Sequence, residues 1–67
     1  MDFRQITYFL CLVEQGSVTR AARKLNIVQP ALSMQISNLE KLVNQRLFER
    51  KPHGMVPTEA AKSMYRL

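Results

Sequence analysis

Two amphipathic segments separated by only three residues constrain the fold of this chain more than any other feature. The first segment has apolar residues at i, i+3, i+4 and i+7, namely Val18, Ala21, Ala22 and Leu25, and this spacing predicts a short helix over 18–25. Pro30 suits the first turn of a following helix, so residues 26–28 form the connection, with Asn26 the residue best suited to a left-handed backbone. A second stripe predicts that following helix over about 29–43 and consists of Leu32, Ile36, Leu39 and Val43. Two helices meeting at so tight a turn have the geometry of a helix-turn-helix.

Another helix is predicted ahead of this pair. Asp2 and Gln5 form a capping pair, because the carboxylate and the amide can each satisfy a free backbone N–H at a helix start. The apolar stripe that follows consists of Phe3, Ile6, Phe9, Leu10 and Val13. Gly16 supplies the left-handed position that ends such a helix, which is therefore expected over 3–15 with its stripe on the core. Leu12 lies off that stripe, which suggests a place in an interface.

The last third of the chain changes character. Residues 47–50 and 55–57 are short extended candidates around a turn-prone, basic stretch, Lys51-Pro52-His53-Gly54, and together they predict a hairpin. Thr58 can cap a fourth helix, which is expected to be still running at Leu67. The predicted fold is mainly α: a winged helix-turn-helix with a three-helix core, a short two-stranded wing and the start of a fourth helix.

Charge and composition favour a binding module over an enzyme. Ten Lys and Arg against five Asp and Glu give the 67-residue chain a formal charge of +5, so polyanions are the first partners to consider. Cys11 is the only cysteine and His53 the only histidine, which excludes an intrachain disulfide and a Cys/His zinc site. The apolar run over 8–13 is too short to span a bilayer, and we expect a cytosolic, reducing context. Acids and bases are scattered singly, so catalysis is not expected.

The face of the 29–43 helix opposite its predicted core is small and polar. Counting about 100° per residue from Leu32, this face carries Pro30, Met34, Ser37 and Lys41, with Ser33 on one flank and Asn38 on the other. Glu40 falls nearer the core side, so no carboxylate lies on the face. The preceding helix adds a basic run of Arg20, Arg23 and Lys24. At least one phosphate contact is expected from that run, and the alternative is a solvated helix face.

At these positions the sequence resembles the LysR-type transcriptional regulators. The stretch over 22–33, Ala-Arg-Lys-Leu-Asn-Ile-Val-Gln-Pro-Ala-Leu-Ser, matches the family pattern Ala-x-x-Leu-x-Val/Ile-x-Gln-Pro/Ser-Ala/Thr-Leu/Val-Ser. In the family's order, the likeness extends to residues 3–9, 16–17, 47–50 and 58–60. It implies a winged helix-turn-helix DNA-binding domain over 1–57 and the start of a dimerising linker helix over 58–67.

The resemblance implies that the recognition helix reads base edges in the major groove. Gln29, Pro30 and Ser33 lie at its N-terminal end, and a Gln side chain can bond bidentately to adenine. Met34 and Ser37 are assigned to the same base-reading set. They replace the long polar residues common in the family, and Met34 is suited to a thymine methyl group.

Contacts outside the major groove are implied as well. Seven residues of the second helix and of the wing, at about 50–55, are expected on phosphates or in the minor groove: Ser17, Arg20, Arg23, Lys24, Arg50, Lys51 and His53. His53 stands where the family commonly carries Arg, and an imidazole is positively charged only at lower pH. Met64 and Tyr65 are assigned to dimerisation, because the family's linker helix pairs with its twofold mate. Cys11 is expected to be a buried, inert thiol.

The predicted function is sequence-specific binding of double-stranded DNA. The expected target is a partly palindromic operator, bound by a homodimer or higher oligomer of the full-length protein, with no membrane association. No cofactor is expected in this fragment, whereas the family's C-terminal domain implies a small-molecule effector. Two alternatives stay open: a helical protein-interaction module, and another winged regulator such as the molybdate-responsive type.

Overall fold

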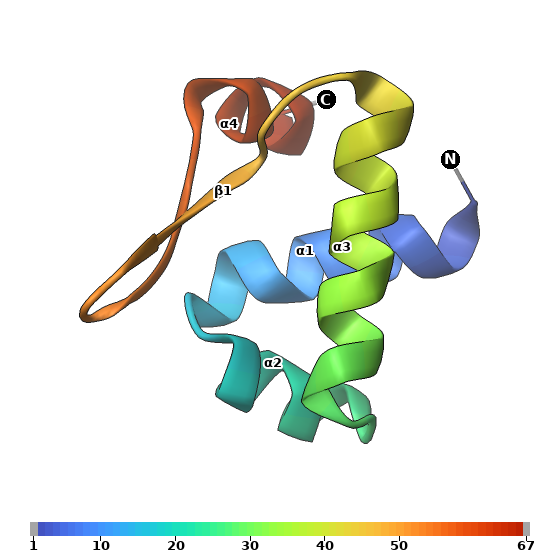
Figure 1. The fold of residues 1–67 in the computed structure, drawn as a ribbon, viewed down its shortest axis with the longest axis vertical. Helices are drawn as coiled ribbons and strands as arrows, with labels where there is room; N and C mark the ends of the chain where they lie inside the picture. Colours follow the sequence, from blue (N-terminus) through green and yellow to red (C-terminus); the bar gives the residue numbers. More distant parts are fainter. Residues whose placement is uncertain (1, 67) are drawn as a thin grey trace.

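The computed structural model describes residues 2–66. Its elements are α1 (Phe3–Gln15), α2 (Val18–Leu25), α3 (Gln29–Val43), β1 (Phe48–Lys51), β2 (Gly54–Pro57) and α4 (Glu59–Arg66). The first three helices form one body, and the β1–β2 hairpin projects from it as a wing (Figure 1). The mainly α, winged helix-turn-helix fold is thus confirmed, as are the predicted bounds of α1, α2 and α3. None of the helices within residues 2–66 combines the length and hydropathy needed to cross a bilayer.

Caps fix the helix ends where the sequence indicates them. Gln5 N–H donates to Asp2 Oδ1 at 2.8 Å and Asp2 N–H donates to Gln5 Oε1 at 3.3 Å. At the other end of α1, Gly16 is left-handed at φ 67°. Ser17 Oγ accepts from the backbone N–H of Arg20 at 3.2 Å, and Asn26 ends α2 in the left-handed region at φ 58°. The first two helices therefore begin and end through local chemistry.

The core lies where α1, α2 and α3 meet, with the start of β1 closing one side. Leu12, Leu32, Leu39 and Leu47 are its largest fully buried side chains. Leu32 and Leu39 confirm the predicted rotation of α3 about its axis. Cys11 is buried too, and its thiol donates to Ala21 O at 3.8 Å.

The predicted core stripe of α1 is correct only in part, because Phe9 is buried and Val13 packs against the core, but the other three residues are exposed. Phe3 is 83% exposed, Ile6 39% and Leu10 37%, whereas Leu12, which we placed in an interface, is only 1% exposed. Phe9 packs against Phe48 of β1, with ring centroids 5.8 Å apart, and the buried side of the helix extends from Phe9 to Leu12 instead of to Ile6 and Leu10. Apolar residues occur around most of α1, so periodicity alone did not identify the side that α3 and the wing cover.

The wing strands are shifted relative to the prediction. β1 pairs antiparallel with β2 in a register that runs from Phe48 opposite Pro57 to Lys51 opposite Gly54. Lys51 and Gly54, predicted as part of the turn, are therefore strand residues, and only two residues are left for the turn. Leu47, predicted as strand, precedes β1 because its N–H donates to Glu40 Oε2 at 2.8 Å instead of to a strand partner.

Two hydrogen bonds from backbone N–H groups of the wing hold it on the helical body. On the α3 side, Glu40 Oε2 also accepts from Phe48 N–H at 3.3 Å. On the α1 side, Met55 N–H donates to Gly16 O at 3.0 Å. Gly54 sits so close to that carbonyl that a Cβ would lie 2.4 Å from the oxygen. The wing is therefore fixed at both strands.

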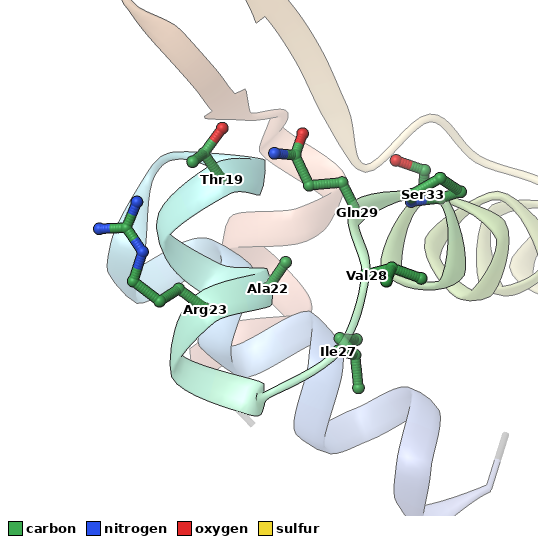
Figure 2. Close-up of a pocket in the computed structure, with 8 residues that line it drawn as sticks. Thr19, Ala22, Arg23, Ile27, Val28, Gln29 and Ser33 are labelled. Carbon is green, nitrogen blue, oxygen red and sulfur yellow. The ribbon is translucent and has the colours of Figure 1, made fainter.

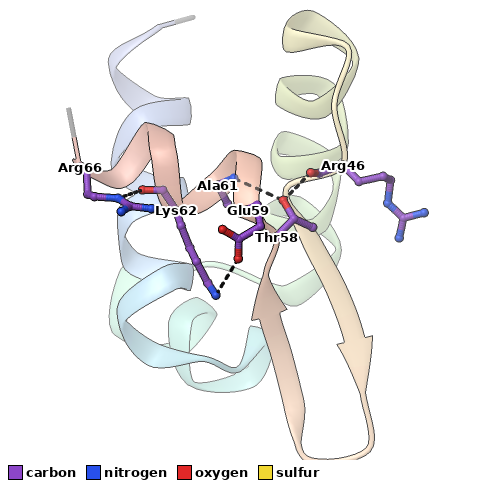
Figure 3. A network of polar contacts seen from close by, with 6 residues as sticks. All are labelled: Arg46, Thr58, Glu59, Ala61, Lys62 and Arg66. Atoms are coloured by element: carbon purple, nitrogen blue, oxygen red, sulfur yellow. Dashed lines mark hydrogen bonds and ion pairs between the residues drawn. The ribbon is translucent and has the colours of Figure 1, made fainter.

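The predicted cap of α4 is confirmed. Thr58 Oγ1 accepts from Ala61 N–H at 3.3 Å and donates to Arg46 O at 2.6 Å, so one hydroxyl joins α4 to the segment before β1 (Figure 3). The expectation that α4 continues at Leu67 lies outside the described residues.

Candidate nucleic-acid interface

The N-terminal half of α3 presents an exposed polar face. Val28 occupies the cap position but supplies no side-chain hydrogen bond, and its side chain is 69% exposed. The five predicted base-reading residues all lie on the surface: Gln29, Pro30, Ser33, Met34 and Ser37. Because Leu32 is completely buried on the opposite side, the helix is held with this face outward.

A hollow between α2 and α3 gathers part of this face. Its lining includes Thr19, Arg23, Val28, Gln29 and Ser33. The hydroxyls of Thr19 and Ser33 and the amide of Gln29 are directed to the same side of the two helices (Figure 2). The sequence analysis missed Thr19 and Val28. Their positions in the sequence could have identified them, because Thr19 lies one helical turn before Arg23 and Val28 directly precedes Gln29.

The basic residues of α2 divide between two sides of the helix. Arg20, Arg23 and Lys24 are all exposed, but of these only Arg23 lines the hollow beside α3. Lys24 lies toward α1, where its charge partly offsets the burial and the Glu14 charge that raise the pKa of the Cys11 thiol. The structure therefore brings Arg23 to the base-reading residues and leaves Lys24 away from them.

Strand alternation also divides the cations of the wing. Successive side chains of a strand point to opposite faces, so Arg50 shares the face of the buried Phe48. Arg50 lines a cleft against α3 together with Ser33. Lys51 is on the other face, where its ammonium lies 3.3 Å from Glu49. This exposed ion pair adds little to stability, and it lies on the face of the strand that points away from α3. His53 is exposed in the turn at the tip of the wing.

The two predicted dimerisation residues make contacts within the chain. Met64 is partly buried against the core. Tyr65 is 43% exposed, and its hydroxyl donates to Glu14 Oε2 of α1 at 3.2 Å. This hydrogen bond and the carboxylate charge raise the pKa of Tyr65 above its usual 10.0. A role of Met64 and Tyr65 in dimerisation stays a prediction.

Within residues 2–66, no group of three His, Cys, Asp or Glu side chains is placed to hold a metal ion. In the same residues, every buried side-chain nitrogen or oxygen has a hydrogen-bond partner. The polar side chains without such partners therefore belong to the surface.

Comparison with known proteins agrees with this geometry. The chain is 48% identical over 65 residues to the nitrogen assimilation regulatory protein nac of Escherichia coli (strain K12), and the match covers 97% of this chain but 21% of nac. The crystal structure of the BenM_DBD/catB site 1 DNA complex is 41% identical, has a TM-score of 0.93, and matches 98% of this chain and 74% of that one. The CbnR_DBD–DNA complex is 33% identical, with a TM-score of 0.94 and coverages of 98% and 76%.

The family itself follows from a match over most of the chain. The sequence profile described as "Bacterial regulatory helix-turn-helix protein, lysR family" matches residues 3–62. This match decides against the other winged-regulator families that the sequence left open. The chain belongs to the LysR family of bacterial regulatory helix-turn-helix proteins.

Proposed function

We propose that this chain binds double-stranded DNA in a sequence-specific manner, with α3 in the major groove. The observation that carries the proposal is the exposed polar face at the N-terminal end of α3. That face is flanked on one side by Arg23 of α2 and on the other by Arg50 of the wing. A major groove about 12 Å wide admits one α-helix, and cations on both sides suit the two phosphate backbones that border it.

Affinity and specificity come from different residues in this proposal. The cations of α2 and the wing release counterions from the phosphates, which gives affinity without sequence preference. Gln29 and Ser33 supply donors and acceptors to base edges, and Pro30 is small enough to let the helix approach. Because α3 has no side-chain cap, its N-terminal dipole end also favours a nearby phosphate.

We extend the proposal to the protein of which this domain is a part. Its relatives are transcriptional regulators, so a regulator's role is proposed here in place of catalysis. Residues 1–57 act as the DNA-binding domain, and 58–67 begin a linker helix that pairs with a second copy. Such a homodimer requires half-sites about one helical turn, or a multiple of it, apart. A C-terminal domain that binds a small-molecule effector completes the proposed protein.

Competition with altered duplexes tests the binding proposal. A duplex is first selected from a random library by the wild-type chain, and its affinity is compared with that of a scrambled duplex of equal length. We expect the selected duplex to bind at least about 10³ times more tightly. The alternative function, a helical protein-interaction module, predicts equal binding to both duplexes.

Two substitutions then locate the reading residues. Gln29→Ala with Ser33→Ala should reduce discrimination between the two duplexes by about tenfold or more, since a good base contact is worth about 1–3 kcal/mol. Ser63→Ala on α4 removes an exposed hydroxyl that does not line the hollow beside Gln29 and Ser33 and serves as the control. Unchanged discrimination in the double variant would contradict the placement of α3.

A further inference from the structure

In the proposed DNA complex, the cleft between α3 and β1 faces one strand of the sugar-phosphate backbone. If α3 lies in the major groove and the wing reaches the neighbouring minor groove, the sugar-phosphate backbone that separates the two grooves passes between α3 and β1. This reasoning rests on the proposed function. It requires that the walls of the cleft suit a phosphodiester anion.

The walls of the cleft have the chemistry that a phosphate needs. The donors in its lining are Ser33 and Ser37 on α3 and, across from them, Arg46 and Arg50. These donors are the groups that would hold an anion, because the lining also includes six apolar residues: Leu12, Val18, Leu32, Ile36, Phe48 and Met55. The cleft has a volume of about 190 Å³, well above the ~10–15 Å³ that one water molecule needs on the corresponding measure. Hydroxyls and guanidinium groups are both common donors to DNA phosphates.

Arg46 is held at the cleft by the fold around it. Its backbone carbonyl accepts from Thr58 Oγ1 at 2.6 Å (Figure 3). Its side chain lies along β1, where Nη2 donates to Phe48 O at 3.5 Å. A guanidinium has five N–H donors, so four are left for a ligand. Arg50 lies on the same side of β1 as Phe48 and provides the second guanidinium.

The charges around the cleft favour an anion on balance. Within residues 2–66, the ion pairs are Lys51 with Glu49 and Lys62 with Glu59, and neither involves an arginine of the cleft. One carboxylate, that of Glu40, also lines the cleft and opposes an anion. Its Oε2 accepts two backbone N–H groups, at 2.8 and 3.3 Å, and these partly compensate its charge. Two guanidinium charges against one carboxylate leave the cleft positive.

We propose that this cleft binds one backbone phosphate in each half-site, with Arg46 and Arg50 as its two cations and Ser33 and Ser37 as hydroxyl donors. Arg46 is thereby a DNA-binding residue that the sequence pattern does not indicate, because it lies between α3 and the wing and outside both motifs. Ser33 and Ser37 act on the DNA backbone in this arrangement in addition to facing the major groove, and Ser33 lines both the hollow and the cleft.

Affinity measured against salt tests the role of Arg46. The selected duplex is titrated with wild type, Arg46→Ala and Arg46→Lys over a range of salt concentrations. Arg46→Ala should weaken binding by about tenfold and reduce the slope of log K against log salt by about 0.9. Arg46→Lys should keep the slope because it keeps the charge. Arg4→Ala, an equal charge loss on exposed α1, should change affinity by less than about twofold.

Neutral linkages identify the phosphate. Single methylphosphonates, which remove the charge of one phosphate, are placed in turn along the half-site. At one position of the neutral linkage, wild type and Arg46→Ala should bind the duplex with equal affinity. At the same position, Arg50→Ala should weaken binding less than it does on the unmodified duplex.

Three results would overturn the inference. They are an Arg46→Ala variant that matches Arg4→Ala in affinity and slope, an Arg46→Ala deficit that persists on every neutral linkage, and a linkage for Arg50 that differs from that for Arg46. In each case wild-type discrimination between selected and scrambled duplexes remains, so the proposed function stands. A wild-type chain that discriminates no duplex would overturn both.

Discussion

Replacement of Gly54 by Ala tests how the wing is held. Gly54 has φ 141°, and an added Cβ would lie 2.4 Å from the carbonyl oxygen of Gly16. That oxygen is backbone and already accepts from Met55 N–H at 3.0 Å, so no flexible side chain can move aside. The substitution must therefore displace the wing from the end of α1.

The structure gives the size of the effect. A non-glycine residue in such a backbone region costs about 1–3 kcal/mol, and loss of the Met55 hydrogen bond adds about 0.5–1.5 kcal/mol. The sum is about 1.5–4.5 kcal/mol, centred on about 3 kcal/mol. A domain of this length has about 3–10 kcal/mol of total stability, so Gly54→Ala should remove a large fraction of it.

Urea unfolding followed by circular dichroism measures this loss. With an m value of about 1 kcal/mol/M, the midpoint should fall by about 3 M. Gly16→Ala is the matched control, because Gly16 also has positive φ but its Cβ would meet nothing within 4 Å; it should cost about 1–2 kcal/mol. Equal losses in the two variants, or no loss in Gly54→Ala, would refute the anchoring role of Gly54.

Three further predictions follow from the contacts. Leu12→Ala should destabilise the chain by about 3 kcal/mol and Leu10→Ala by less than about 1 kcal/mol in urea unfolding; the reverse order would restore the stripe predicted from sequence. Because the Glu14 bond raises the folded-state pKa of Tyr65, it stabilises the fold below the usual value of 10.0 and is lost as pH rises through the raised value. Stability of wild type should therefore fall more than that of Tyr65→Phe in strongly alkaline urea titrations, and parallel curves would exclude this. Met34→Arg should shift the base preference selected from a random duplex library, since Arg favours guanine; an unchanged preference would exclude base contact at this position.

The helix ends were predictable from sequence because they are set by short-range chemistry. Asp2 and Gly16 act on backbone groups within four residues, so their effect is visible in the sequence. The rotation of α3 was predictable for a related reason, since Leu32, Ile36, Leu39 and Val43 recur at helical spacing on one side of the helix. Here local pattern and tertiary packing agree.

The rotation of α1 and the strand bounds required the tertiary structure. Leu12 is buried and Leu10 is exposed because of how α1 packs on the rest of the fold, where Phe9 contacts the ring of Phe48 from a distant part of the chain. The start of β1 is set by Glu40, which draws the N–H of Leu47 away from the strand ladder. No local pattern records either contact.

The candidate interface was predictable where a family motif covers it. Gln29, Pro30 and Ser33 lie on the exposed face of α3, as the resemblance implied. Arg46 belongs to the loop between α3 and β1 and is brought to the cleft by Thr58 and Phe48. Its place in the site depends on the wing's orientation, which the sequence does not specify.

A nuclear magnetic resonance titration tests the central claim most directly. The ¹⁵N-labelled chain is titrated with the selected duplex and, separately, with its scrambled counterpart. The proposed placement predicts that the selected duplex shifts the backbone amides of 28–37 most strongly, with smaller shifts over 17–23 and 46–54. The exposed stripe that contains Phe3, Ile6 and Leu10 should be unaffected. Shifts centred on that stripe, or identical shifts with both duplexes, would contradict α3 as the element that reads the major groove.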